Sequence, residues 1–113
     1  MATLRRYCGE TILEIKDGYI KEYCGHTLYE IKNNQLRRYC GPIMYEFNEK
    51  YIKEYCGHTL LEFDGRYVRR YCGPIVYEVN GNQIREYCGH TLYEIVGFIT
   101  HQELMGLLAV LFA

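Results

Sequence analysis

The sequence predicts a mainly β fold, a 12-stranded antiparallel meander of six 16-residue hairpin repeats curled or closed around one C-terminal α-helix. The first observation behind this is the triplet YCG, which occurs six times, always 16 residues apart, and such a fixed period marks a repeat architecture. The second is that each repeat contains two turn signals. The third is a very apolar C-terminal segment.

Length and composition fit one domain over residues 1–113, long enough to bury a core without cross-links. The chain has 13 Lys and Arg against 14 Asp and Glu, a net charge of -1. This balance predicts no strong attraction to nucleic acid or to an anionic membrane surface. The 13 Tyr and only two Pro favour pleated sheet.

The two ends of the chain predict a cytoplasmic protein without a membrane span. The N-terminus, MATLRRYCGE, has no apolar stretch, so we expect neither a signal peptide nor a membrane anchor there. Without export, the six Cys are expected to be reduced thiols. The apolar run 104–113 is much shorter than the ~20 residues that a spanning helix needs.

Six repeats occupy residues 3–96 when each is numbered from its YCG tyrosine as position 1. Position 8 is always Glu, position 15 is always Lys or Arg, and positions 9 and 14 are Ile, Leu, Val or Phe. Two short strands in each repeat account for this pattern. Gly at position 3 predicts a two-residue type II′ turn, and the pairs DG, NN, EK, GR and GN at positions 11 and 12 predict type I′ turns.

These turns predict a register in which position 9 faces position 14, position 8 faces 15, and position 7 faces 16. Every position-8 Glu would then face a basic residue on both neighbouring strands. Positions 2, 5, 7, 9, 14 and 16 share the more apolar face. The other face carries the position-1 Tyr, the position-6 aliphatic residue and the charge ladder, and it reads as solvent-facing.

A second period of 32 residues is superimposed on the first, because position 16 alternates in charge. The six residues there are Arg6, Glu22, Arg38, Glu54, Arg70 and Glu86. Since six is even, a closed ring would contain no seam between like charges.

The C-terminal segment 100–113 predicts a helix from His101 to about Phe112. Thr100 and Glu103 match the S/T-x-x-E capping box that opens helices. The expected core side chains of this helix are Leu104, Met105, Leu107, Leu108, Val110, Leu111 and Phe112. They surround the helix, which therefore needs cover on all sides.

A closed sheet would supply this cover. Twelve strands at ~4.8 Å spacing form an untilted ring of radius ~9 Å, near the size that holds one helix. Closed barrels need stagger between strands, so a bulge or a lengthened YCG turn would have to provide it. The alternative fold is a two-sided β-solenoid capped by the helix, with the position-16 charges stacked directly.

The segments DGYIKEYCG, DGRYVRRYCG, GNQIREYCG and ELMGLLAVLFA resemble short bacterial repeat proteins of uncharacterised function. In those proteins, two-strand repeats of ~16 residues precede an apolar C-terminal helix. In strand number and terminal helix the chain is also similar to the tubby-like and LURP-one-related barrels. That second resemblance implies an enclosed central helix, and it carries no ligand-binding residue over to this chain.

Three repeats contain Cys-Gly-His, and Cys and His are residue types typical of zinc sites and of nucleophilic catalysis. The residues are Cys24, His26, Cys56, His58, Cys88 and His90. Equivalent residues two strands apart would be separated by ~9.6 Å, too far to share one zinc ion. A catalytic Cys needs a unique pocket, whereas this motif is present in triplicate. The sequence therefore predicts no catalytic residue and no cofactor, and metal binding through these turns is the least favoured of the alternative functions.

The strongest functional signal is the stripe of position-1 tyrosines on the outer face. It consists of Tyr7, Tyr23, Tyr39, Tyr55, Tyr71 and Tyr87. Exposed aromatic surface often marks a partner site. We expect a non-enzymatic structural or protein-interaction repeat protein that binds copies of itself or a protein partner. The alternative function is a small barrel that binds an apolar ligand or lipid.

Overall fold

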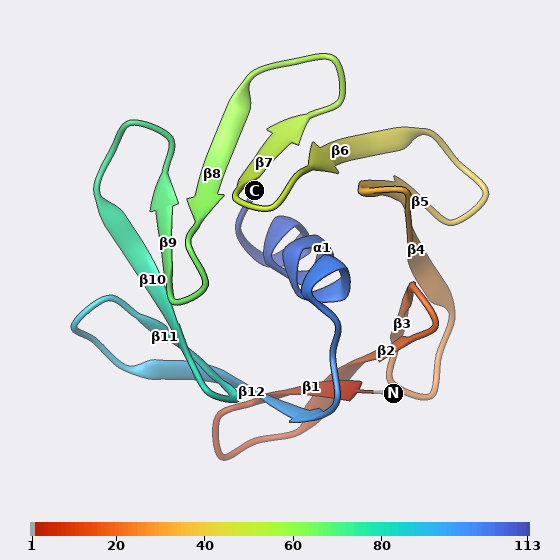
Figure 1. Cartoon of the computed structure of the whole chain (residues 1–113). Helices are drawn as coiled ribbons and strands as arrows, with labels where there is room; N and C mark the ends of the chain where they lie inside the picture. Colours follow the sequence, from red (N-terminus) through yellow and green to blue (C-terminus); the bar gives the residue numbers. More distant parts are fainter. Residues whose placement is uncertain (1) are drawn as a thin grey trace.

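Twelve short strands follow one another around a ring, and the chain ends in one helix at its centre (Figure 1). The computed structural model describes residues 2–113. The strands are β1 (Ala2–Arg6), β2 (Thr11–Lys16), β3 (Tyr19–Glu22), β4 (Thr27–Lys32), β5 (Gln35–Arg38), β6 (Ile43–Phe47), β7 (Tyr51–Glu54), β8 (Thr59–Phe63), β9 (Tyr67–Arg70), β10 (Ile75–Asn80), β11 (Gln83–Glu86) and β12 (Thr91–Gly97). The helix is α1 (His101–Phe112).

All neighbouring strands are antiparallel and the sheet closes, which confirms the predicted barrel and excludes the solenoid. The turns at positions 11 and 12 produce the expected register, with Ile15 opposite Ile20 and Glu14 opposite Lys21. Asp17 and Gly18 have φ of 52° and 83°, and Asn33 and Asn34 have 54° and 61°, the left-handed values that a type I′ turn requires. The type I′ prediction is wrong for the other three inner turns, because Glu49, Lys50, Arg66 and Asn82 do not have positive φ. These turns lie close to the helix, and the YCG turns lie at the outside of the ring (Figure 1).

The YCG turns differ from the prediction, because Cys and not Gly takes the left-handed conformation. Cys24 has φ of 57°, and its five equivalents lie within a degree or two of that value. The Gly25 amide donates to the Glu22 carbonyl, so the turn reverses around Tyr-Cys, and positive φ at its third residue is typical of type II turns. Gly is needed at position 3 for another reason: a Cβ on Gly25 would lie 2.9 Å from the Cβ of Glu22.

Each YCG hairpin also contains a bulge, and the bulge supplies the stagger that closure requires. Position 9 of one strand faces position 14 of the next, and position 14 faces position 7 of the strand after that. Each repeat thus shifts the register by two residues, and six repeats shift it by twelve. A shear equal to the strand number is also found in eight-stranded barrels of shear 8, whose strands tilt by about 36°.

The same shift corrects the predicted charge ladder. Each position-8 Glu pairs with a basic residue on one neighbouring strand only, as Glu30 does with Arg37. On the other side, Glu30 faces Tyr19 at position 13.

The seam of the barrel lies between β1 and β12, the one adjacent pair in the described ring that no turn connects. Thr3, Leu4 and Arg5 face Val96, Ile95 and Glu94, the register that positions 13, 14 and 15 have within the other repeats. The N-terminal strand therefore completes the sixth repeat, which the chain leaves at Gly97 to form the helix.

The helix fills the barrel. Thr100 accepts a hydrogen bond from the Glu103 amide and Glu103 returns one to the Thr100 amide, so the predicted capping box is formed. Met105, Leu107 and Leu108 are completely buried, and every side chain at positions 9 and 14 is at most 7% exposed. A Cβ at Gly106 would collide with Ile31, which explains a glycine in the middle of a helix.

We expect Leu108→Asp to unfold the domain, because an unpaired charge would replace a fully buried side chain. The loss should reach about 4 kcal/mol or more, a large part of the stability of a small domain. Thermal and urea unfolding measure it. Val96→Asp is the matched control, since Val96 is 49% exposed and its equivalent in the fourth repeat is Asp64. An unchanged midpoint for Leu108→Asp would mean that the helix is not enclosed.

Candidate functional site

The outer rim of the ring carries the six position-1 tyrosines, which we call the Tyr belt: Tyr7, Tyr23, Tyr39, Tyr55, Tyr71 and Tyr87. Each begins a YCG turn, and each is between 46% and 52% exposed. The repeat therefore presents the same aromatic side chain, in the same local conformation, at six places around the rim.

Three residues of the Tyr belt are fixed by a second tyrosine at position 13 on the outer face. The rings of Tyr19 and Tyr39 meet edge to face at 6.2 Å, and two further pairs, Tyr51 with Tyr71 and Tyr67 with Tyr87, have the same geometry. Such pairs contribute about 0.5–1.5 kcal/mol beyond area burial. Negative charge on Glu30, opposite Tyr19 in the sheet, raises the pKa of that phenol.

Below the Tyr belt, an ion-pair ladder encircles the outer face. Position-15 and position-8 side chains form six pairs, with N to O distances between 3.5 and 4.0 Å. The strongest arrangement is at Glu78, which is 8% exposed and also accepts a hydrogen bond of 2.9 Å from Arg66. These carboxylates are engaged in holding neighbouring strands together.

The inner face becomes accessible where the barrel opens toward the YCG turns. Position 7 lies opposite position 16 across each hairpin, as Tyr77 does to Glu86, and Tyr77 stacks on Phe112 with ring centroids 3.8 Å apart. This layer therefore surrounds the C-terminal end of the helix. Side chains at position 7 are buried or half-buried, and the alternating charges at position 16 are exposed. We call this surface the mouth.

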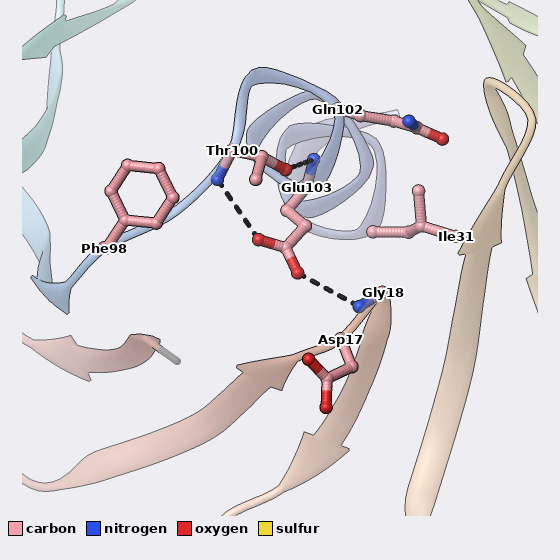
Figure 2. A pocket seen from close by; sticks show the side chains of 7 residues that line it. All are labelled: Asp17, Gly18, Ile31, Phe98, Thr100, Gln102 and Glu103. Atoms are coloured by element: carbon pink, nitrogen blue, oxygen red, sulfur yellow. Dashed lines mark hydrogen bonds between the residues drawn. The ribbon is translucent and has the colours of Figure 1, made fainter.

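At the opposite end, a pocket of about 370 Å³ separates the start of the helix from the first inner turn (Figure 2). Its walls are the Asp17-Gly18 turn, Ile31 and the segment 98–103. Glu103 points across it: one carboxylate oxygen accepts from the Gly18 amide at 3.0 Å, and the other accepts from Thr100. This carboxylate therefore has a structural task, to fasten the helix to the turn.

Three further contacts fasten the helix start. The Gln102 side chain accepts from the Asn34 amide, and the His101 ring lies 3.1 Å from the Glu49 carbonyl and stacks on Phe63. Sequence reasoning recognised Glu103 as a capping residue and missed its bond to Gly18, for which no local signal exists. It also missed the exposed pair Val96 and Phe98, 49% and 74% exposed, although Val96 stands where the other repeats have Lys, Asn or Asp.

The Cys-Gly-His residues stay apart. All six Cys are exposed free thiols at the tips of separate hairpins. Within residues 2–113, no three His, Cys, Asp or Glu side chains come close enough to hold one metal ion. The structure thus assembles no zinc site from Cys24, His26, Cys56, His58, Cys88 and His90.

Comparison of the chain with family models, curated proteins and solved structures gave no match. No helix within residues 2–113 is both long enough and apolar enough to cross a membrane.

We expect Glu103→Ala to lower the free energy of unfolding by about 1–3 kcal/mol, because it removes two charge-assisted hydrogen bonds at the helix start. Urea denaturation measures the change. Glu49→Ala removes an exposed carboxylate from a neighbouring inner turn and serves as the control, with an effect below about 0.5 kcal/mol. Equal losses in the two variants would mean that the carboxylate of Glu103 does not fasten the helix.

Replacement of His26, His58 and His90 by Ala should leave the melting temperature within a few degrees of the parent, since the three rings occupy exposed turns. Chelation of zinc by EDTA should leave both proteins folded. Circular dichroism with and without EDTA is the measurement. Loss of structure on chelation, prevented by added zinc, would establish a metal site.

Proposed function

We propose that this chain is a non-enzymatic interaction protein whose Tyr belt binds a protein surface, either another copy of the chain or a different protein. The observation that carries the proposal is the half-exposure of six large aromatic side chains in equivalent places on a closed barrel. Tyrosine buries much area on binding and loses little side-chain entropy, so it is favoured at protein interfaces.

The electrostatic character of the chain supports a protein partner chosen by contact rather than by charge. The net charge is -1, and the outer carboxylates are paired with basic residues in the ladder beneath the Tyr belt. Such a surface attracts neither phosphate backbones nor anionic lipid over a distance. The proposal includes a cytoplasmic location, which the six exposed thiols favour, because free thiols persist in reducing compartments.

The second candidate function, a barrel that binds an apolar ligand, requires the helix to leave the interior. Complete burial of Met105, Leu107 and Leu108 favours a helix that stays in place as the core. Leu111 and Phe112, at the C-terminal end of the helix, are only partially buried. Replacement of the helix by an apolar ligand would have to start at this end.

Tyr7, Tyr23 and Tyr55 are the positions at which to test the Tyr belt, since their rings are outside the three edge-to-face pairs. Their replacement by Ser should abolish partner recovery and cost at most about 1 kcal/mol per site. Replacement by Phe keeps the ring and is the matched control. Tagged proteins are recovered from the native cell, and the mass of the intact assembly identifies the partner or a second copy.

The proposal expects the parent and the Phe variant to retain the same Tyr-belt partner in the same ratio, and the Ser variant to lose that partner. Retention of that partner by the folded Ser variant would contradict the proposal. So would recovery of the parent chain as an isolated monomer that also stays monomeric in light scattering at high concentration.

A further inference from the structure

The mouth carries a ring of six charges of alternating sign, which we call the charge ring: Arg6, Glu22, Arg38, Glu54, Arg70 and Glu86. All six side chains are exposed. They share the inner face with position 7, since each lies directly opposite a position-7 residue, five of them across a hairpin and Arg6 across the seam. Position-7 side chains and the last residues of the helix pack against the same core, and Tyr77 stacks on Phe112, so the ring encircles an apolar centre at the mouth.

The charges of this ring are not neutralised by one another. Successive members lie on alternate strands, β1, β3, β5, β7, β9 and β11, and no ion pair joins two of them in the described chain. Among residues 2–113, the one ion pair that any of them forms is Arg6 with Glu10 of the same turn, at 3.3 Å. Five of the six charges, three of them acidic, therefore face solvent without an ion-pair partner in the described chain.

An alternating ring is complementary to a copy of itself turned over. A two-fold axis in the plane of the ring reverses the order of the six members. If the axis passes midway between an Arg and its neighbouring Glu, every Arg meets a Glu of the other copy, and every Glu meets an Arg. One such arrangement pairs Arg6 with Glu22, Arg38 with Glu86 and Arg70 with Glu54, each twice. A ring of one sign would repel its copy under the same operation.

We propose that the mouth binds the mouth of a second copy of this chain, forming a two-fold symmetric dimer with the charge ring of each copy on that of the other. The interface would have the usual anatomy, an apolar centre of position-7 and helix-end side chains inside a polar rim. A disc 36 Å across has a face of about 1,000 Å², and a stable interface uses about 800 Å² per partner. This dimer does not involve the Tyr belt, so it stands or falls separately from the proposed function.

Two complementary triple variants test the dimer. In the acidic ring, Arg6, Arg38 and Arg70 are changed to Glu; in the basic ring, Glu22, Glu54 and Glu86 are changed to Arg. The parent forms a dimer in light scattering, and each variant alone is monomeric, with a dissociation constant raised at least about 100-fold by like-charge contact. An equimolar mixture of the two restores a dimer of one copy each, which also requires that both variants are folded.

A matched control changes the net charge equally at the other end of the barrel. Lys16, Lys32 and Lys50 are exposed near the inner turns, and their replacement by Glu should leave the dimer intact. The dimer of the parent should weaken with added salt, as exposed ion pairs do. A monomeric parent, or an acidic ring variant that dimerises as the parent does, would overturn the proposal, and so would variants that stay monomeric when mixed.

Cross-linking through the native thiols gives a second measurement if a ring variant does not fold. The thiols of the Arg repeats are Cys8, Cys40 and Cys72, and those of the Glu repeats are Cys24, Cys56 and Cys88. Two proteins are made, one with the first set of Cys changed to Asn and the other with the second set changed to Asn. Asn tolerates the left-handed turn conformation of these positions. A short bis-maleimide should link the two proteins to each other in a mixture and link neither to itself. Equal self-linking would contradict the two-fold pairing.

Discussion

The two-residue shift at each YCG hairpin is the constraint on which the structure depends. It originates in a turn that places Cys24 and its equivalents at positive φ and in a bulge beside that turn. Without the shift, strands joined by tight turns would lie parallel to the barrel axis, and the twelve strands would lack the shear of a tilted barrel. With it, the ring closes at a size that one helix fills.

Closure and the helix support each other. The β1–β12 pair at the seam has the same antiparallel register as the pairs within the repeats, so the described strands form one continuous ladder at the seam. The helix supplies what the sheet cannot, a filled interior, and the sheet covers a helix that is apolar all round. Burial of Leu4 at the seam and of Leu108 in the helix shows that both contribute to one core.

The same repeat geometry creates two distinct surfaces. Positions 1 and 13 point outward, giving an aromatic belt with Tyr39, Tyr71 and Tyr87 held in edge-to-face pairs. Positions 7 and 16 point inward and emerge at the mouth, where Tyr77 meets Phe112 and the charges alternate in sign. A sixteen-residue period places like side chains on the belt, while the thirty-two-residue period puts opposite charges on neighbouring repeats of the mouth.

The sequence by itself determined the strands, the inner turns, the capped helix and the division of each strand into a core face and an outer face. These follow from period-two alternation, from Asp-Gly and Asn-Asn pairs and from Thr100 with Glu103, all of which act over a few residues. It also indicated the Tyr belt and the alternation at position 16. Only the tertiary structure decided that Cys would take the left-handed place in the YCG turn, and that the sheet register would place a basic residue opposite each position-8 Glu on one neighbouring strand instead of two.

The same holds for the bond from Glu103 to Gly18, which joins residues 85 positions apart. The physical reason is that a turn's backbone conformation and a contact between chain ends are chosen by the closed ring as a whole. One bulge changes the register of one hairpin, whereas six of them together bring β1 to β12 around the helix.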